Sequence, residues 1–133
     1  MTEHPAIRVT ALDHIVLRCR DIEASLAWYL DVLGLEPDRV DEWRAGQAPF
    51  PSARVDAHTI IDLFPVDADT DEGPGRLDHL CLVIDPIDLD ELAGGGVFTV
   101  VGGPGRRYGA RGDGTSLYVL DPEGTTVELR HYG

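Results

Sequence analysis

Lysine is absent from this chain of 133 residues, and all 11 basic residues are arginine. A chain without lysine has no Schiff-base amine, no P-loop lysine and no Ser–Lys pair, so these kinds of chemistry are excluded. Serine is scarce as well. Only Ser25, Ser52 and Ser116 occur, and none of them lies in a G-x-S-x-G motif, so the nucleophile elbow of the α/β-hydrolases is also missing.

Cysteine and long apolar runs are equally limited. Cys19 and Cys81 allow at most one disulfide, which a cytosolic chain does not need. No run of 18 apolar residues occurs, so no membrane span is predicted. Because the first residues lack the basic and apolar regions of a signal peptide, we expect a cytoplasmic protein.

Positive charge is outnumbered by negative charge. The 24 acidic residues and 11 basic residues give a formal net charge of −13. Such a chain repels phosphate backbones, so we expect no nucleic acid as partner, and without a membrane span we expect no membrane partner either. The composition is that of a globular chain, and its length fits a single domain. Five histidines and many carboxylates remain as material for a metal site.

Hydrophobic spacing predicts short strands and two helices. Asp21 is the expected N-cap of a helix over Asp21–Leu33, which Gly34 ends, and a second helix over Asp85–Leu92 is cut short by glycines. Strands are expected over Leu12–Arg20, His58–Val66, Leu77–Ile84, Val97–Val101, Ser116–Leu120 and Thr125–His131. Three stretches are predicted to be loops or poor in strands: Glu36–Ala53, Asp67–Gly75 and Gly102–Gly114.

The two halves of the chain resemble each other. Leu12–Leu17 (LDHIVL) matches Leu77–Leu82 (LDHLCL), and near the end of each half Ile61–Leu63 (IDL) matches Val127–Leu129 (VEL). Each half therefore reads as a strand, a helix and several further strands. A histidine stands near the start of each half and a carboxylate near its end.

These repeated polar residues suggest a metal site. Side chains alternate along a strand, so His14, His79 and Glu128 are expected on the polar faces of their strands, away from the helices. Two imidazoles and one carboxylate form the facial triad of octahedral first-row metals. The alternatives stay open at this point. Each histidine is compatible with a structural role, and Glu128 with an ion pair to Arg18 or Arg130.

At this stage the residues resemble a known family. The Leu-Asp-His strand starts, the helix end from Trp28 to Leu35 and the ending from Asp121 to Leu129 (DPEGTTVEL) resemble the vicinal oxygen chelate superfamily. This group includes glyoxalase I, extradiol dioxygenases, fosfomycin and bleomycin resistance proteins and methylmalonyl-CoA epimerase. The resemblance covers about residues 10 to 132. It implies an α+β fold of paired βαβββ modules, about 10–66 and 75–132, whose curved mixed sheet encloses a cavity.

The resemblance also implies a ligand set. The metal ligands fall on His14, His79 and Glu128, and a fourth ligand position falls on Asp62, where the family usually has Glu or Gln. Asp is one methylene shorter, so it is expected to reach the metal only through water. The cofactor implied is a divalent ion, with Fe, Mn, Ni, Zn and Mg not distinguished. Small members are generally homodimers, and we expect one here.

The implied reaction depends on Asp62. If Asp62 serves as ligand or base, with Glu128 as the other catalytic carboxylate, the chain is a lyase or isomerase of the glyoxalase type, which we favour. One alternative is an extradiol-type ring-cleaving dioxygenase with Fe(II). Another is a non-enzymatic drug-binding resistance protein, which the net charge of −13 suits because such drugs are cationic.

Arg111 and Tyr118 are candidate substrate ligands. The predicted loop before the last hairpin contains Arg106, Arg107 and Arg111, and of these Arg111 is assigned to an anionic substrate. The alternative is that these arginines only balance an acidic surface. Tyr118 is expected to supply a hydroxyl to the cavity.

Overall fold

A computed structural model describes residues 6–67, 76–120, 122 and 124–133. The chain divides into two compact units, which we describe separately. We call His14–Asp78 the N-module. The described residues of Met1–Asp13 and His79–Gly133 together form the C-module. Strand β1 (Val9–Cys19) contributes its first residues to the C-module and its remainder, from His14, to the N-module.

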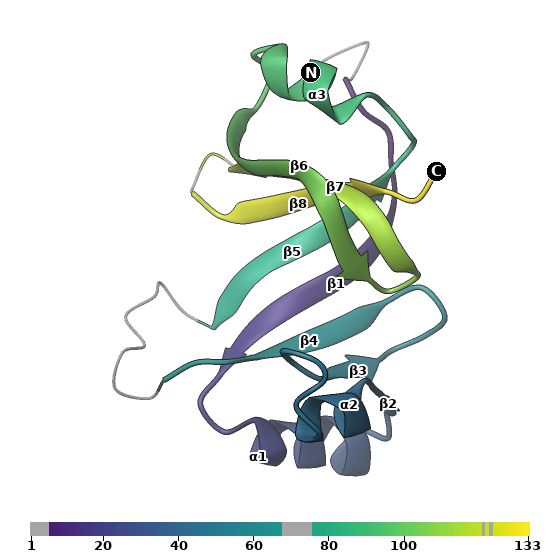
Figure 1. Cartoon of the computed structure of the whole chain (residues 1–133), viewed down its shortest axis with the longest axis vertical. Helices are drawn as coiled ribbons and strands as arrows, with labels where there is room; N and C mark the ends of the chain where they lie inside the picture. Colours follow the sequence, from purple (N-terminus) through teal and green to yellow (C-terminus); the bar gives the residue numbers. More distant parts are fainter. Residues whose placement is uncertain (1–5, 68–75, 121, 123) are drawn as a thin grey trace. The chain divides into compact units, whose positions relative to one another are not determined.

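The N-module contains a four-stranded mixed sheet. Its strands are β1 from His14 onward, β2 (Glu36–Asp38), β3 (Ser52–Arg54) and β4 (Ile60–Pro65). Their order across the sheet is β2-β3-β4-β1. Strands β1 and β4, which come first and last along the chain, run parallel, and the other neighbouring pairs are antiparallel. Figure 1 shows β4 between β1 and β3. The first strand of the repeat is thus held beside its last.

A helical segment follows β1 as the apolar spacing predicted. Helix α1 (Ile22–Leu26) is capped by Asp21, whose carboxylate accepts a hydrogen bond from the Ala24 N–H at 3.0 Å. It continues as a π-helix over Ala27–Val32, and the predicted end at Gly34 is confirmed by a φ of +75° there. Helix α2 (Val40–Arg44) adds a short turn within Glu36–Ala53, the stretch predicted to be poor in strands.

The C-module repeats the same topology. Its strands are β5 (Leu77–Ile84, with its first two residues in the N-module), β6 (Thr99–Gly109), β7 (Gly112–Leu120) and β8 (Thr126–His131), with α3 (Leu89–Gly94) after β5. Their order across the sheet is β5-β8-β7-β6. Strands β5 and β8, which come first and last along the chain, are again parallel. The α+β class and the paired βαβββ modules are therefore confirmed. The single domain, the enclosed cavity and the homodimer stay predictions.

The predicted loop over Gly102–Gly114 is wrong. All of it except a short turn is strand, because β6 and β7 pair as far as Gly109 and Gly112. Register shifts on either side of Gly102 let this glycine-rich strand bend, and a Cβ on Gly103 would lie 2.6 Å from the Ser116 carbonyl oxygen. Long-range pairing here overrides the weak strand propensity of glycine.

Other predicted boundaries shift by a few residues. Strand β5 has the predicted bounds, β1 begins earlier than predicted, and β4 begins after His58. The second helix, predicted over Asp85–Leu92, is capped by Asp88, whose carboxylate accepts from the Glu91 N–H at 3.1 Å. Residues 68–75 of the predicted acidic loop and residues 121 and 123 of the DPEGTTVEL ending lie outside the described residues.

Each module has its own apolar core on the helix side of its sheet. In the N-module the buried cluster joins the sheet to α1, α2 and their surroundings: Cys19, Ile22, Leu26, Val40 and Leu63. In the C-module it joins the sheet to α3: Ile84, Leu89, Leu92, Leu117, Val119 and Leu129. These residues lie on the predicted apolar faces, so the opposite face of each sheet carries the polar side chains. Cys19 and Cys81 are both free, buried thiols.

Candidate metal centre

In the C-module, His79 and Glu128 come together from two adjacent parallel strands. The register of β5 and β8 pairs Cys81 with Glu128, so His79 lies two residues earlier on the same face. His79 Nε2 and Glu128 Oε1 are 3.1 Å apart, and both residues are buried. The two residues are therefore in direct contact within this module, and their role as metal ligands stays a prediction.

The separation of these two atoms suits a metal ion. Two ligand atoms about 2.1 Å from one ion and at right angles lie about 3.0 Å apart. Imidazole nitrogen and carboxylate oxygen are both common ligands of divalent first-row metals. With a proton on Nε2 and no ion present, the same separation is a charge-assisted hydrogen bond. The pair thus fits two adjacent positions of a metal site.

The other oxygen of Glu128 is held by the protein. Glu128 Oε2 accepts from Ser116 Oγ at 2.6 Å, from Arg130 Nη2 at 2.8 Å and from Arg130 Nε at 3.3 Å. Of the two ion-pair partners that the sequence allowed for Glu128, Arg130 is therefore used. Burial alone would lower the pKa of Arg130, but hydrogen bonding and the charge of Glu128 raise it overall. The guanidinium stays protonated.

The N-module carries a corresponding pair. His14 and Asp62 are both buried, and His14 Nε2 lies 3.8 Å from Asp62 Oδ2. The register of β1 and β4 pairs Val16 with Asp62, which gives the same two-residue displacement as in the C-module. Ser52, directly opposite Asp62 on β3, donates from Oγ to Asp62 Oδ1 at 2.5 Å. Each module thus has a histidine on its first strand, a serine on its third and a carboxylate on its last.

Asp62 contacts a serine and a histidine. Arg54, an arginine on the neighbouring strand, bonds Asp38 Oδ2 at 2.6 and 3.1 Å and the carbonyl oxygens of Asp56 and Ala57. Asp62 is consequently held on the polar face of the N-module by Ser52, with its second oxygen toward His14.

Tyr118 lies beside the C-module pair, whereas Arg111 does not. Tyr118 is opposite Glu128 in the β7–β8 register, and its ring makes an edge contact with His79 at 5.7 Å between centroids. Burial, and next the charge of Glu128, raise the pKa of Tyr118, so its hydroxyl stays protonated at neutral pH. Arg111 lies at the β6–β7 turn with its guanidinium over the Tyr132 ring. Arg107 is the arginine whose guanidinium lies over Tyr118, at 5.9 Å.

Sequence reasoning missed the serines as functional partners. Ser52 and Ser116 both lie on the third strand of their module, and both are fully buried. Their equivalent places in the two halves are a signal that the repeat could have given. Buried hydroxyls near a carboxylate are expected to be hydrogen-bonded to it.

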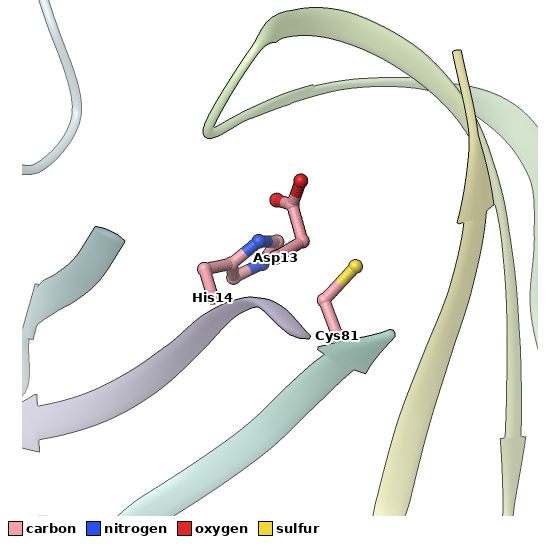
Figure 2. A group of neighbouring side chains, drawn as sticks. All are labelled: Asp13, His14 and Cys81. Carbon is pink, nitrogen blue, oxygen red and sulfur yellow. The ribbon is translucent and has the colours of Figure 1, made fainter. Parts of the chain in front are cut away.

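A further buried carboxylate serves the fold of the C-module. Figure 2 shows Asp13 on β1 and Cys81 on β5 as sticks, together with His14, the residue that follows Asp13. Asp13 Oδ2 accepts from the Ala110 N–H at 3.0 Å, and Oδ1 accepts from the Tyr132 hydroxyl. Both oxygens of Asp13 therefore hold the β6–β7 turn and the chain end. Asp78, its counterpart in the repeat, is exposed.

Comparison with known proteins assigns the chain to a family. The sequence model of the glyoxalase/bleomycin resistance protein/dioxygenase superfamily matches residues 11–129. The glyoxalase domain-containing protein RDO1 of Mycosarcoma maydis is 33% identical over 129 residues, which cover 95% of this chain and 70% of RDO1. Virulence protein STM3117 of Salmonella typhimurium is 29% identical over 126 residues, covering 93% of this chain and 85% of that protein.

Solved structures show the same fold. The Mn(II)-bound glyoxalase from Novosphingobium aromaticivorans matches with a TM-score of 0.67 at 24% identity over 94% of this chain, which spans 40% of that chain. Methylmalonyl-CoA epimerase from Mycobacterium tuberculosis matches with a TM-score of 0.60 at 19% identity, covering 98% of this chain and 93% of the epimerase. At these identities the likeness establishes the architecture. Among the described residues, no helix is long and apolar enough to cross a membrane.

Proposed function

The chain belongs to the glyoxalase/bleomycin resistance protein/dioxygenase superfamily, and from this premise we propose that it is a divalent-metal-dependent lyase or isomerase. Its substrate is a small molecule with two neighbouring oxygens. The observation that carries the proposal is the repeated arrangement of histidine, serine and carboxylate on the polar face of each module. The names of two structural relatives, a glyoxalase and an epimerase, support the same class of reaction.

In this proposal one ion is held by His14, His79 and Glu128. The support is the equivalence of the two histidines in the repeat, and the contact of His79 Nε2 with Glu128 Oε1 in the C-module. Asp62 occupies the fourth position. Its Oδ2 lies farther from its histidine than Glu128 Oε1 does from His79, 3.8 Å against 3.1 Å, as its shorter side chain predicts. The bound ion would supply a Lewis acid that stabilises negative charge developing on a substrate oxygen.

The protein's own groups move the proton. Asp62 acts as the general base, taking the proton from the substrate carbon onto Oδ2. The Ser52 hydroxyl, bonded to Oδ1, fixes the carboxylate so that Oδ2 remains the reactive oxygen. On the other module, the protonated hydroxyl of Tyr118 donates a hydrogen bond to the substrate. Arg111, at the β6–β7 turn, remains the residue proposed for an anionic part of the substrate.

Metal content tests this proposal. Protein purified without chelators is expected to hold about one divalent ion per chain by elemental analysis, and His79→Ala is expected to lose it. His58→Ala is the matched control, because His58 is an exposed histidine. An unchanged metal content in His79→Ala contradicts the assignment.

An activity screen then separates the reaction classes. We expect turnover of a hemithioacetal or of an epimerisable acid rather than cleavage of catechols. Ring cleavage with Fe(II) and O₂ would make the chain a dioxygenase. Tight binding of a cationic drug by protein that holds no metal would make it a resistance protein without enzymatic activity.

A further inference from the structure

Arg130 is a fully buried cation in a chain with a strongly negative charge. Besides Glu128, its guanidinium reaches backbone carbonyls of the neighbouring hairpin. Nη2 donates to the Tyr108 oxygen at 2.9 Å and Nη1 to the Arg107 oxygen at 3.0 Å. Nη1 also lies 3.4 Å from the Gly112 carbonyl oxygen and 3.4 Å from the Tyr132 hydroxyl oxygen. Hydrogen bonds from this one planar group to Glu128 on β8 and to backbone carbonyls of β6 and β7 fix the position of the Arg130 side chain.

Two glycines leave room for this guanidinium. A Cβ on Gly109 would lie 2.1 Å from Arg130 Nη1 and 2.6 Å from its Cζ, and a Cβ on Gly114 would lie 3.2 Å from Nη1. A side chain at Gly109 would therefore push Arg130 away from Glu128. Glycines in the β6–β7 hairpin thus leave the space that Arg130 occupies while it contacts Glu128, the candidate metal ligand.

The contacts of Glu128 divide its two oxygens between two tasks. Oε2 receives the hydroxyl of Ser116 and two N–H groups of Arg130, which is about the capacity of one carboxylate oxygen. Oε1 is the oxygen that faces His79. A carboxylate held in this way can offer only Oε1 to an ion.

We propose that Arg130 and Ser116 are positioning residues that keep Glu128 a monodentate ligand through Oε1, an inference that rests on the proposed function. The positive charge of Arg130 also withdraws electron density from the carboxylate. Glu128 then donates less charge to the ion than an unpaired carboxylate would, and the ion remains a stronger Lewis acid. This arrangement suits chemistry in which a substrate oxygen becomes negatively charged.

Removing the hydroxyl of Ser116 gives the first test. Co²⁺ is titrated into metal-free wild type, Ser116→Ala and Ser116→Thr, and affinity is measured by calorimetry and coordination by visible absorption. In Ser116→Ala we expect roughly 10- to 100-fold weaker binding, the usual effect of losing a group that orients a ligand. We also expect weaker absorption bands, because Oε2 keeps only its contacts with Arg130, and any approach of this oxygen to the ion raises the coordination number. Ser116→Thr keeps the hydroxyl and is expected to restore both.

Displacing Arg130 without deleting it gives the second test. Gly109→Ala is expected to change affinity and absorption in the same direction as Ser116→Ala, because its Cβ would occupy the place of Nη1. Gly94→Ala is the control, since a Cβ there meets nothing within 4 Å. Urea unfolding of each metal-free variant measures the change in stability separately.

The outcomes distinguish this inference from the proposed function. Weakened binding and altered absorption in Ser116→Ala and Gly109→Ala, with Thr rescue and an unchanged Gly94→Ala, support the positioning role. If wild type binds one Co²⁺ and all four variants bind it with the same affinity and spectrum, the positioning role is wrong and the metal site stands. If wild type binds no metal, both are wrong.

Discussion

The two modules build the same polar triplet but give its carboxylate different neighbours. In the C-module Glu128 shares its Oε2 between Ser116 and the buried cation Arg130. In the N-module Asp62 receives Ser52, and the residue two places further along its strand, in the position of Arg130, is Phe64. The residue two places after the carboxylate is thus a cation in one strand and an aromatic residue in the other.

This difference separates two roles that a carboxylate can have. A carboxylate neutralised by a guanidinium is a weak base, since the ion pair favours its charged form, and such a group suits a permanent ligand. In the proposed function Glu128 is accordingly the permanent ligand and Asp62 the base, so the two modules would supply both roles from one structural plan.

The largest effect is expected from removing the cation. Arg130→Met leaves Glu128 buried without its ion pair, and we expect the free energy of unfolding to fall by about 3–5 kcal/mol. Urea denaturation followed by circular dichroism measures this loss. Arg106→Met is the control, since Arg106 is exposed and should change stability by less than about 0.5 kcal/mol. Equal stability of the two variants would contradict the importance of the buried pair.

The next effect concerns the proposed base. Asp62→Asn keeps an oxygen for the Ser52 hydroxyl but removes the proton acceptor, so turnover should fall by about 10²-fold or more while metal stays bound. Asp41→Asn, at an exposed carboxylate of the same module, is the matched control. Activity within a few-fold of wild type, or catechol cleavage that Asp62→Asn performs equally well, would remove Asp62 from the role of base.

The repeat made much of the fold predictable. Leu12–Leu17 and Leu77–Leu82 gave two equivalent strand starts, and the spacing after Asp21 gave the first helix. Strand β5 was predicted with its observed bounds because its Leu-Asp-His start repeats that of the first strand and an apolar run, Leu80–Ile84, follows it. These features are local, so they can be read from sequence without knowledge of the partners.

The parts that were missed depend on long-range pairing. Strand β6 contains Gly102, Gly103 and Gly105 and lacks any alternation, and only its register with β7 makes it a strand. The site followed the same pattern. The histidines were predictable from the repeat, and Arg130 was one of two ion-pair partners named for Glu128. The choice of Arg130 depends on the space left by Gly109, which the sequence pattern does not show.

The smallest effect tests whether the two modules differ only at their sites. Each begins its first helix with an aspartate cap: Asp21 accepts from the Ala24 N–H at 3.0 Å, and Asp88 accepts from the Glu91 N–H at 3.1 Å. Replacing either by Ala removes an acceptor for one N–H of the first turn and a negative charge near the helix N-terminus. The expected loss is about 1 kcal/mol in both cases.

Asparagine separates the cap from the charge in this comparison. Asn caps a helix about as well as Asp, so Asp21→Asn and Asp88→Asn should each lie within about 0.5 kcal/mol of wild type in urea denaturation. Matching losses for the two Ala variants would mean that the duplicated modules kept equivalent frameworks and diverged around their carboxylates. A loss several times larger at Asp21 than at Asp88 would instead show that the π-helical extension of α1 makes the N-module depend more on its first turn.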